Sequence, residues 1–260
     1  MRICLLAGVL GLLLAAPPLS AQQTVDQARL MLTIGGGFVG GGSLWHIPNQ
    51  PIADGFLGVD TFDLTRRIRP ILGVVFSGTY FPGEHVGFHG EAFLLGLGTE
   101  DDCRLATAGT PRTVSVCGSI DGSKKSATAV SISGGVVYRI MSRRLISPYD
   151  RLSLGLAYTP QSTISAKGIT ETGSELVVYS DPDPKRLTGY ASLAGGFTAA
   201  VARGYQIRLE VRDNYVGVRR VTSATSGADF TPPTSLDGKH IFSLTMGFDV
   251  VLERRRGRRY

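Results

Sequence analysis

One segment of the chain carries charges at every second position, where they could pair with one another or act in proton chemistry. In residues 205 to 212, Arg208, Glu210 and Arg212 alternate with apolar residues. Successive side chains of a β-strand point to opposite faces, so the three charges share one face and the apolar residues the other. This pattern favours a structural ion-pair network, with a gated channel or a buried catalytic carboxylate as alternatives. Taken alone, the segment fits a soluble sandwich or a membrane barrel.

The beginning of the chain has the pattern of a secretory signal peptide. Arg2 precedes an apolar run over residues 3 to 16, and small residues lead to Ala21 before the polar Gln22. The run is too short for a membrane span, although an anchored signal is the alternative. We predict cleavage after Ala21, so residues 1 to 21 are the signal peptide and residues 22 to 260 form one exported domain.

The same alternation recurs along the mature chain. No later segment approaches the roughly 18 consecutive apolar residues of a spanning helix, so any membrane contact must be made by strands. The alternation predicts eight strands, at residues 29 to 39, 56 to 65, 72 to 80, 130 to 140, 152 to 158, 188 to 201, 205 to 215 and 240 to 253.

The connections between these strands alternate in length. Short connections lie at residues 66 to 70, 141 to 148 and 202 to 204, and long polar ones at residues 41 to 54, 83 to 127, 160 to 187 and 217 to 239. Short periplasmic turns that alternate with long external loops are typical of outer-membrane barrels. The predicted fold class is therefore all-β, an eight-stranded antiparallel up-and-down transmembrane β-barrel.

Two parts of the pattern leave alternatives open. Residues 86 to 98 could form an additional strand, and residues 112 to 120 a further one, which gives ten strands. Asp60 and Asp63 fall on opposite faces of the second strand, so that strand contains a bulge or ends before Asp63.

The cysteines favour eight strands over ten. Cys4 leaves with the signal peptide, and Cys103 and Cys117 remain as a pair in an oxidising compartment, where we predict a disulfide. Closing a loop of this size stabilises by about 3 kcal/mol in the chain-entropy model. A metal site is the alternative, but no histidine flanks either cysteine at ligand spacing. A ten-stranded barrel would move the two cysteines toward opposite ends, whereas one large external loop keeps them together.

An eight-stranded barrel has an interior just wide enough for its own side chains. The polar faces of the predicted strands supply charges of both signs, namely Arg139, Arg151, Arg208, Glu210, Arg212, Asp249 and Glu253. Unpaired charge in so narrow a space is costly, so we predict an ion-pair network that blocks the lumen.

The signal peptide, the eight alternating strands and the closing stretch over residues 245 to 252 resemble the small outer-membrane β-barrels of the OmpA-like and OmpW-like superfamily. The last strand is similar to the assembly signal of such barrels: Thr245, Gly247 and Val250 match it, while Leu252 stands where an aromatic residue is usual. The resemblance implies an integral protein in the outer membrane of a Gram-negative-type envelope. Its implied partners are outer-membrane lipid, lipopolysaccharide, the barrel-assembly machinery and an external ligand, and it implies a monomer.

The resemblance leaves three functions open. We predict a structural or surface-interaction role, with uptake of small apolar molecules or a narrow porin-like channel as the alternative. Some outer-membrane barrels are lipid-modifying enzymes, and the four histidines fall in or beside predicted external segments, with His89 and Glu91 on one strand face. A serine nucleophile at a fixed offset is not evident, so we predict no enzyme, cofactor or metal.

The Arg-rich end of the chain, residues 254 to 260, could bind nucleic acid if read alone. An exported protein rarely meets nucleic acid, so no nucleic-acid partner is predicted. We interpret this tail as a periplasmic segment that contacts anionic lipid or is solvated. A soluble secreted sandwich is the fallback for the whole chain.

Overall fold

The computed structural model describes residues 27 to 53, 58 to 96, 98 to 125, 128 to 160, 162 to 226 and 230 to 255. The predicted signal peptide with its cleavage after Ala21 lies outside the described residues, as does the end of the Arg-rich tail. No helix among the described residues is long and apolar enough to cross a membrane.

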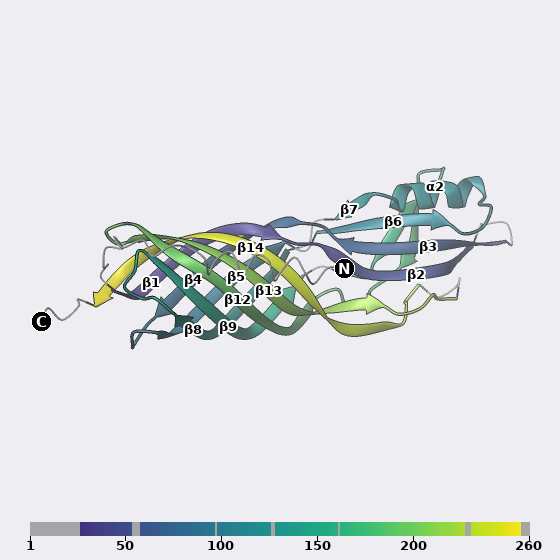
Figure 1. Cartoon of the computed structure of the whole chain (residues 1–260). Helices are drawn as coiled ribbons and strands as arrows, with labels where there is room; N and C mark the ends of the chain where they lie inside the picture. The colour runs from purple at the N-terminus through teal and green to yellow at the C-terminus, as the bar shows by residue number, and fades with distance from the viewer. Residues whose placement is uncertain are drawn as a thin grey trace, which may run out of the picture.

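Eight antiparallel strands close into a barrel, and neighbours in the barrel follow one another along the chain (Figure 1). The closure is made by β1, which pairs with both β4 and β14. The barrel strands are β1 (Gln27–Val39), β4 (Ile71–Tyr80), β5 (Val86–Gly96), β8 (Thr128–Arg139), β9 (Ile146–Thr159), β12 (Arg186–Ala202), β13 (Tyr205–Val221) and β14 (Thr234–Arg255). The predicted eight-stranded antiparallel barrel is thereby confirmed.

The alternation of the sequence becomes an alternation between the barrel interior and its outer surface. On β13, Val211 and Tyr215 are 58% and 47% exposed, whereas Arg208, Glu210 and Arg212 are buried. Pleating places every second side chain on the same face. The apolar face of this strand therefore lies outside the barrel and the charged face inside.

The prediction of which segments form the barrel was wrong in one place. Residues 59 to 65 of the predicted second strand, residues 56 to 65, belong to β3 (Val59–Ile68), which lies in a separate sheet, and the predicted short connection at residues 66 to 70 is largely strand. Residues 86 to 96 are the barrel strand instead. Alternation shows that a strand has two unlike faces. It does not show whether the apolar face contacts lipid or a protein core, so the two segments look alike in sequence.

The alternative of a bulge or an early end in the predicted second strand concerns β3. This strand runs through Asp63 and pairs with β6 (Thr99–Leu105) without a register shift. The register shifts lie in its pairing with its other neighbour, β2 (Gly42–Ala53).

One end of the barrel carries only short connections, at residues 81 to 85, 140 to 145 and 203 to 204, and we call it the turn end. The tightest of these turns contains Gly204, whose φ of 97° is accessible to glycine at little cost. The other end, the loop end, carries the long connections. The predicted short turns at residues 141 to 148 and 202 to 204 are confirmed within a few residues.

The long connections fold into a second unit, which we call the cap (Figure 1). It consists of a four-stranded sheet in the order β2-β3-β6-β7, a hairpin of β10 and β11, and one helix. The remaining bounds are β7 (Ser123–Lys125), β10 (Ala166–Ile169), β11 (Glu175–Tyr179) and α2 (Pro111–Ile120).

The segment offered as a tenth strand, residues 112 to 120, is helix α2. Thr110 caps its first turn, because its side chain accepts a hydrogen bond from the Thr113 amide, and Pro111 occupies the first helical position. A hydroxyl cap followed by proline is a helix-start signal, and it outweighs the β-propensity of the valines in this segment. Cys103 on β6 and Cys117 on α2 form the predicted disulfide, with a Cα–Cα distance of 5.4 Å, inside the cap.

Candidate functional site

The inward faces of three barrel strands bring two carboxylates and two guanidinium groups together in the middle of the lumen. β5 contributes Glu91, β9 contributes Arg151, and β13 contributes Glu210 and Arg212. We call these four residues the quartet. Each side chain is at most 2% exposed, so the quartet is shielded from solvent.

The quartet forms a closed ring of charge-assisted hydrogen bonds. Arg151 donates from Nη1 to Glu91 Oε2 at 3.0 Å and from Nη2 to Glu210 Oε1 at 2.8 Å. Arg212 donates from Nη1 to Glu91 Oε1 at 2.7 Å and from Nε to Glu210 Oε1. Two positive and two negative charges cancel, and each carboxylate is held by both arginines. Burial of the four charges is tolerable because each of them is paired and hydrogen-bonded.

Neutral side chains extend this ring. The Tyr149 hydroxyl donates to Glu210 Oε2 at 2.6 Å, and His89 Nε2 lies 3.4 Å from Glu91 Oε2. His89 Nδ1 also lies 3.0 Å from the Thr79 hydroxyl. The predicted sharing of one face by His89 and Glu91 is confirmed, but His89 lies inside the barrel rather than in an external segment. His89 therefore belongs to the quartet's surroundings and is not available at the rim.

A second ion pair lies nearer the turn end. Arg208 on β13 donates from Nε and Nη2 to Asp249 Oδ2 on β14, at 3.2 and 3.1 Å. The other carboxylate oxygen of Asp249 has no hydrogen-bond partner among the described residues, and neither has the hydroxyl of Thr33, which is opposite Asp249 on β1. This pair is joined to the quartet through Tyr149, whose ring centroid lies 5.4 Å from the Arg208 guanidinium carbon.

Two of the charges predicted for the lumen network lie apart from it. Glu253 is 46% exposed and pairs with Arg29, which is 39% exposed, so this pair lies on the outside of the turn end. The pairing of β14 with β1 shifts register near Leu30. Counting every second residue from Asp249 therefore does not predict which face of β14 carries Glu253. Arg139 is buried in the barrel, but it donates to the carbonyl oxygens of Ala28 and Glu84 and not to a carboxylate.

The sequence prediction missed Glu91 as the second carboxylate of the quartet. Its strand was an open alternative, and only its inclusion in the barrel brings Glu91 opposite Arg151 and Arg212. The available signal was the position of Glu91 on the β5 face opposite the apolar Phe88, Ala92 and Leu94, because a charge within an otherwise apolar strand marks an inward face.

Above the quartet, toward the loop end, apolar side chains enter the lumen beside polar ones such as Asn214. Phe93, Val216 and Ile241 are at most 3% exposed and belong to one hydrophobic cluster. The cluster continues without a break into the cap, where it includes Leu64 and Trp45. The barrel interior and the cap interior therefore form a single apolar core above the charged layer.

The barrel wall has a gap at the loop end, between β12 and β13. Their pairing ends at Tyr190 and Val216, although β12 begins at Arg186 and β13 continues to Val221. Beyond this row β12 pairs only with β9 and β13 only with β14.

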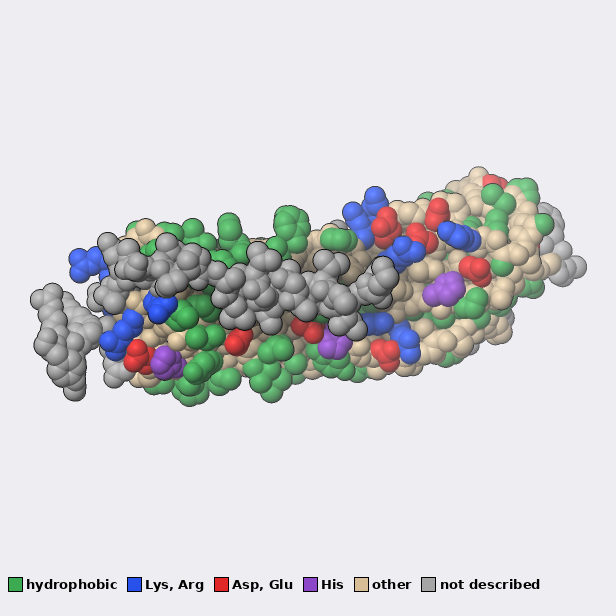
Figure 2. Space-filling view, viewed as in Figure 1, with side chains coloured by type: hydrophobic (Ala, Val, Ile, Leu, Met, Phe, Trp, Pro, Cys, Tyr) green, Lys and Arg blue, Asp and Glu red, His purple; other side chains and the backbone are tan. Residues whose placement is uncertain are grey.

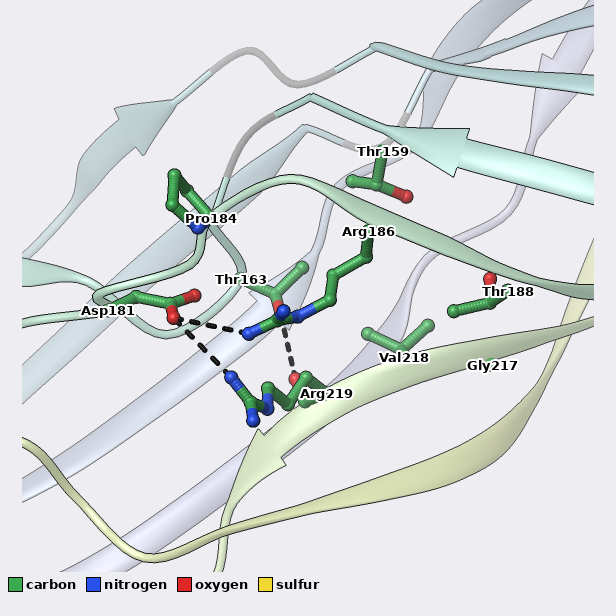
Figure 3. A pocket seen from close by; sticks show the side chains of 9 residues that line it. All are labelled: Thr159, Thr163, Asp181, Pro184, Arg186, Thr188, Gly217, Val218 and Arg219. Carbon is green, nitrogen blue, oxygen red and sulfur yellow. Dashed lines mark hydrogen bonds and ion pairs between the residues drawn. The ribbon is translucent and has the colours of Figure 1, made fainter.

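One buried carboxylate bridges the two strands across this gap (Figure 3). Asp181, whose side chain is 3% exposed, lies 3.5 Å from Arg186 on β12 and 3.5 Å from Arg219 on β13. The Thr163 hydroxyl donates to the Arg219 carbonyl at 2.7 Å, so it satisfies one backbone group that the gap leaves without a strand partner. A small pocket lies between these residues and Thr188.

The proposed assembly-signal residues lie on β14. Thr245 and Gly247 face the interior side of the strand, and Leu252 is 56% exposed on the outer surface. Val250 is half-buried and pairs with Tyr205 on β13. Phe248 supplies an outward aromatic side chain that stacks on Tyr205, at a centroid distance of 5.4 Å.

Neither metal nor serine chemistry is assembled in the part of the chain that the structure describes. No group of three or more histidine, cysteine, aspartate or glutamate side chains there could hold a metal ion. His46 contacts Thr65, His85 contacts the Arg139 carbonyl, and His240 contacts Asp213, so no described histidine is hydrogen-bonded to a serine hydroxyl.

Comparison with protein-family models and with curated proteins gives no match. Among solved structures, the chain is similar to the Neisserial surface protein A, at 12% identity and a TM-score of 0.44, over 86% of this chain and 97% of that one. It is similar to the outer membrane protein OprG from Pseudomonas aeruginosa, at 12% identity and a TM-score of 0.46, over 88% and 98%. It is also similar to Ail, the attachment invasion locus protein of Yersinia pestis, at 13% identity and a TM-score of 0.34, over 86% and 99%. These identities are low, and the function is argued below from the residues of this chain.

Proposed function

We propose that the protein is an integral outer-membrane β-barrel with a closed interior, and that it serves a structural or surface-interaction role through its cap. The observation that carries this proposal is the inverted distribution of side chains in the barrel, with apolar residues outside and a neutral ring of charges inside.

The outer surface of the barrel supports membrane insertion. Ile132, Leu154 and Met246 are 69%, 65% and 63% exposed, and hydrophobic side chains project along the barrel in Figure 2. An apolar surface that encircles a barrel far exceeds the few hundred Å² of apolar patch that soluble proteins usually expose. Contact with lipid removes this surface from water.

Two groups of tyrosines mark a band of suitable height. Tyr80, Tyr138 and Tyr205 lie near the turn end, and Tyr158 and Tyr215 lie nearer the loop end; all are partly exposed. Ten residue steps of β13 separate Tyr205 from Tyr215. At about 3.3 Å per residue and a tilt of about 40°, these steps rise about 25 Å, which is the height of the apolar band in outer-membrane barrels.

Closure of the interior is supported at two levels. The quartet fills the middle of the lumen, and residues of the cap hold the segment around Thr163 and Ser165 across the loop end. Trp45 donates from its indole to the Thr163 carbonyl at 3.1 Å, and Arg66 and Lys125 donate to the Ser165 carbonyl at 2.9 and 3.0 Å.

Planar-bilayer recording of the refolded protein tests the closed interior. We expect no steady conductance from the wild-type protein or from Glu253→Gln, whose side chain lies outside the lumen. Steady conductance of the wild-type protein would overturn the closed interior. A separate extraction tests the membrane assignment, because recovery of the natively expressed protein in a detergent-free extract would contradict it.

The proposed partners follow from the position of the cap. Arg67 and Lys124 are 64% and 58% exposed on its sheet, and charged side chains gather where the cap meets the barrel (Figure 2). Cations at this level favour contact with phosphate groups of lipopolysaccharide. We include lipid, the barrel-assembly machinery and an external ligand of the cap as partners of a monomeric protein without enzymatic activity.

Trypsin added to intact cells tests the orientation of the protein in the membrane, since it should cleave the cap at exposed basic residues and spare the barrel.

The gap between β12 and β13 favours one second candidate, uptake of small apolar solutes through the barrel wall. Separation of these strands would connect the apolar core near Val216 and Tyr190 with the outer leaflet. A β-carbon placed at Gly217 would lie 3.2 Å from Thr188 Cβ, close to the separation found in disulfides. The double variant Thr188→Cys/Gly217→Cys can therefore lock the gap.

Uptake of a fluorescent apolar solute by cells separates the two candidates. Under the second candidate, the oxidised double variant takes up less solute than its reduced form, and Asp181→Ala takes up more than the wild-type protein. Equal uptake by the locked variant, the wild-type protein and cells that lack the protein would leave the structural role as the function.

A further inference from the structure

The charges inside the barrel do not balance. The nearly fully buried ionised groups among the described barrel residues are four arginines and three carboxylates, namely Arg139, Arg151, Arg208, Arg212, Glu91, Glu210 and Asp249. The quartet is neutral, and so is the pair of Arg208 with Asp249. The remaining positive charge belongs to Arg139.

Arg139 is 4% exposed and has no carboxylate partner among the described residues. Its Nη1 and Nη2 donate to the carbonyl oxygens of Ala28 and Glu84 at 3.0 and 3.3 Å, and its guanidinium carbon lies 3.4 Å from the centroid of the Phe81 ring. Its Nε is buried without a hydrogen-bond partner. The Glu84 carboxylate contacts Ser142 and Arg143, and its charge acts on Arg139 without a direct ion pair. A buried cation without a direct ion-pair partner is costly, since carbonyl dipoles only partly replace the lost hydration.

A cavity adjoins this unpaired charge. It lies in the lumen between Arg139 and the layer of Arg208, and its lining includes both arginines, Tyr149, Thr79 and Thr198. The lining also includes the apolar Met31, Phe81 and Val137, and it includes no carboxylate. The buried carboxylates of the barrel are held in the quartet and by Arg208. The cavity is small, with about 10 Å³ of space for the centre of a water-sized sphere.

We propose that this cavity binds one small monovalent anion, chloride under ordinary conditions, between Arg139 and Arg208. The anion neutralises the excess charge of the lumen and accepts a hydrogen bond from Arg139 Nε. The size of the cavity excludes phosphate and organic carboxylates, and the positive lining disfavours a metal cation.

Thermal unfolding in an uncharged detergent tests this site. Chloride is exchanged for gluconate at constant ionic strength, and the midpoint is read from the conversion of the folded, fast-migrating form on a gel. For the wild-type protein we expect a saturable rise of about 4 °C at a tenfold excess of chloride over its dissociation constant. Arg139→Gln should show no chloride-dependent rise. Arg143→Gln is the matched control, because Arg143 is 54% exposed and pairs with Glu84 outside the cavity, and it should respond as the wild-type protein does.

Anomalous scattering from crystals grown in bromide provides a measurement that does not depend on a variant. A bromide peak between Arg139 and Arg208 is expected. Absence of this peak, absence of a chloride response in the wild-type protein, or an equal response in Arg139→Gln would overturn the site. None of these outcomes bears on membrane insertion or on the closed lumen, so failure of this proposal is distinguishable from failure of the proposed function.

Discussion

Leu154 on the barrel and Val59 on the cap are almost equally exposed, at 65% and 60%, yet the residues around them follow opposite rules. Around Leu154 the outer surface is apolar and the interior carries the quartet. The face of β3 that carries Val59 also carries charged pairs such as Arg67 with Asp102, and the interior of the cap is apolar. The difference supports the proposed function, in which lipid surrounds the barrel wall and water surrounds the cap.

The two units also stabilise buried charge differently. The cap contains one buried pair, in which Arg66 donates to both oxygens of Asp101 at 2.5 and 2.6 Å and lies 5.1 Å from the centroid of the Trp45 ring. The barrel contains a ring in which every carboxylate has two arginine partners. The single bidentate pair lies beside an apolar core, whereas the ring occupies the middle of the lumen.

The largest loss of folding stability should come from removing one carboxylate of the quartet. Glu210→Ala leaves Arg151, Arg212 and the Tyr149 hydroxyl without their shared acceptor, and loss of one partner of a buried ion pair costs about 3 to 5 kcal/mol. We expect the midpoint of urea unfolding of the barrel to fall accordingly. Glu253→Gln, which breaks only the exposed pair with Arg29, should cost at most about 1 kcal/mol. Equal losses in the two variants would show that the ring contributes nothing beyond a surface pair.

The second-largest loss of stability should come from an arginine substitution at Leu154, compared with the same substitution at Val59, which has nearly the same exposure. Leu154→Arg places a charge on the surface that we assign to lipid, which costs about 2 to 4 kcal/mol near the middle of a bilayer. Val59→Arg places the same charge at nearly the same exposure on the cap, and a surface change of this kind stays within about 0.5 kcal/mol. Unfolding from lipid vesicles, followed by gel migration, measures both. A similar cost at the two positions would contradict the assignment of separate solvents.

Removal of the disulfide should affect the cap and spare the barrel. The double variant Cys103→Ser/Cys117→Ser releases a loop with a sequence separation of 14 residues between β6 and α2, and the chain-entropy model gives a loss of about 3 kcal/mol. Limited proteolysis should then cut the cap faster, while the heat-modifiable migration of the barrel stays unchanged. A loss of that migration would mean that the barrel depends on the cap for its stability.

The smallest effect concerns the acid stability of the cap. Asp60 accepts hydrogen bonds from the Thr113 hydroxyl at 2.5 Å and the Thr110 amide at 3.1 Å, and these bonds lower the pKa of Asp60 below its ordinary value of 3.8. A carboxyl group with a lowered folded-state pKa stabilises the fold above its unfolded-state pKa, and this contribution is lost as pH falls through the folded-state value. The cap should therefore become easier to digest with an acid protease below about pH 4.

Asp60→Asn is the control for this acid effect. The variant lacks the titrating group, so its digestion should depend less on pH in the same range and should be somewhat faster near neutrality. An identical pH profile for Asp60→Asn and the wild-type protein would exclude Asp60 as the source.

Much of this arrangement could be predicted from local patterns. The alternation over residues 205 to 215 is sufficient to place Arg208 and Arg212 on one face, because the pleat of a strand has a period of two residues regardless of its surroundings. The spacing and redox setting of Cys103 and Cys117 likewise predict their bond. Residues 112 to 120 show the limit of this reasoning, since a strand there would keep the number of barrel strands even, whereas the cap of Thr110 with Pro111 produces a helix.

The sequence by itself determined that this protein is built of two-faced strands closing into an eight-stranded barrel, and that charges of both signs face inward. Only the tertiary structure decided that β5 and not β3 is a barrel strand, that Glu91 completes the ring while Glu253 lies outside it, and that Arg139 has no carboxylate partner among the described residues. Strand pairing and its register shifts couple residues far apart in the chain, whereas alternation along a strand is a local property. A local pattern can therefore fix which side chains share a face, but not which partners that face meets.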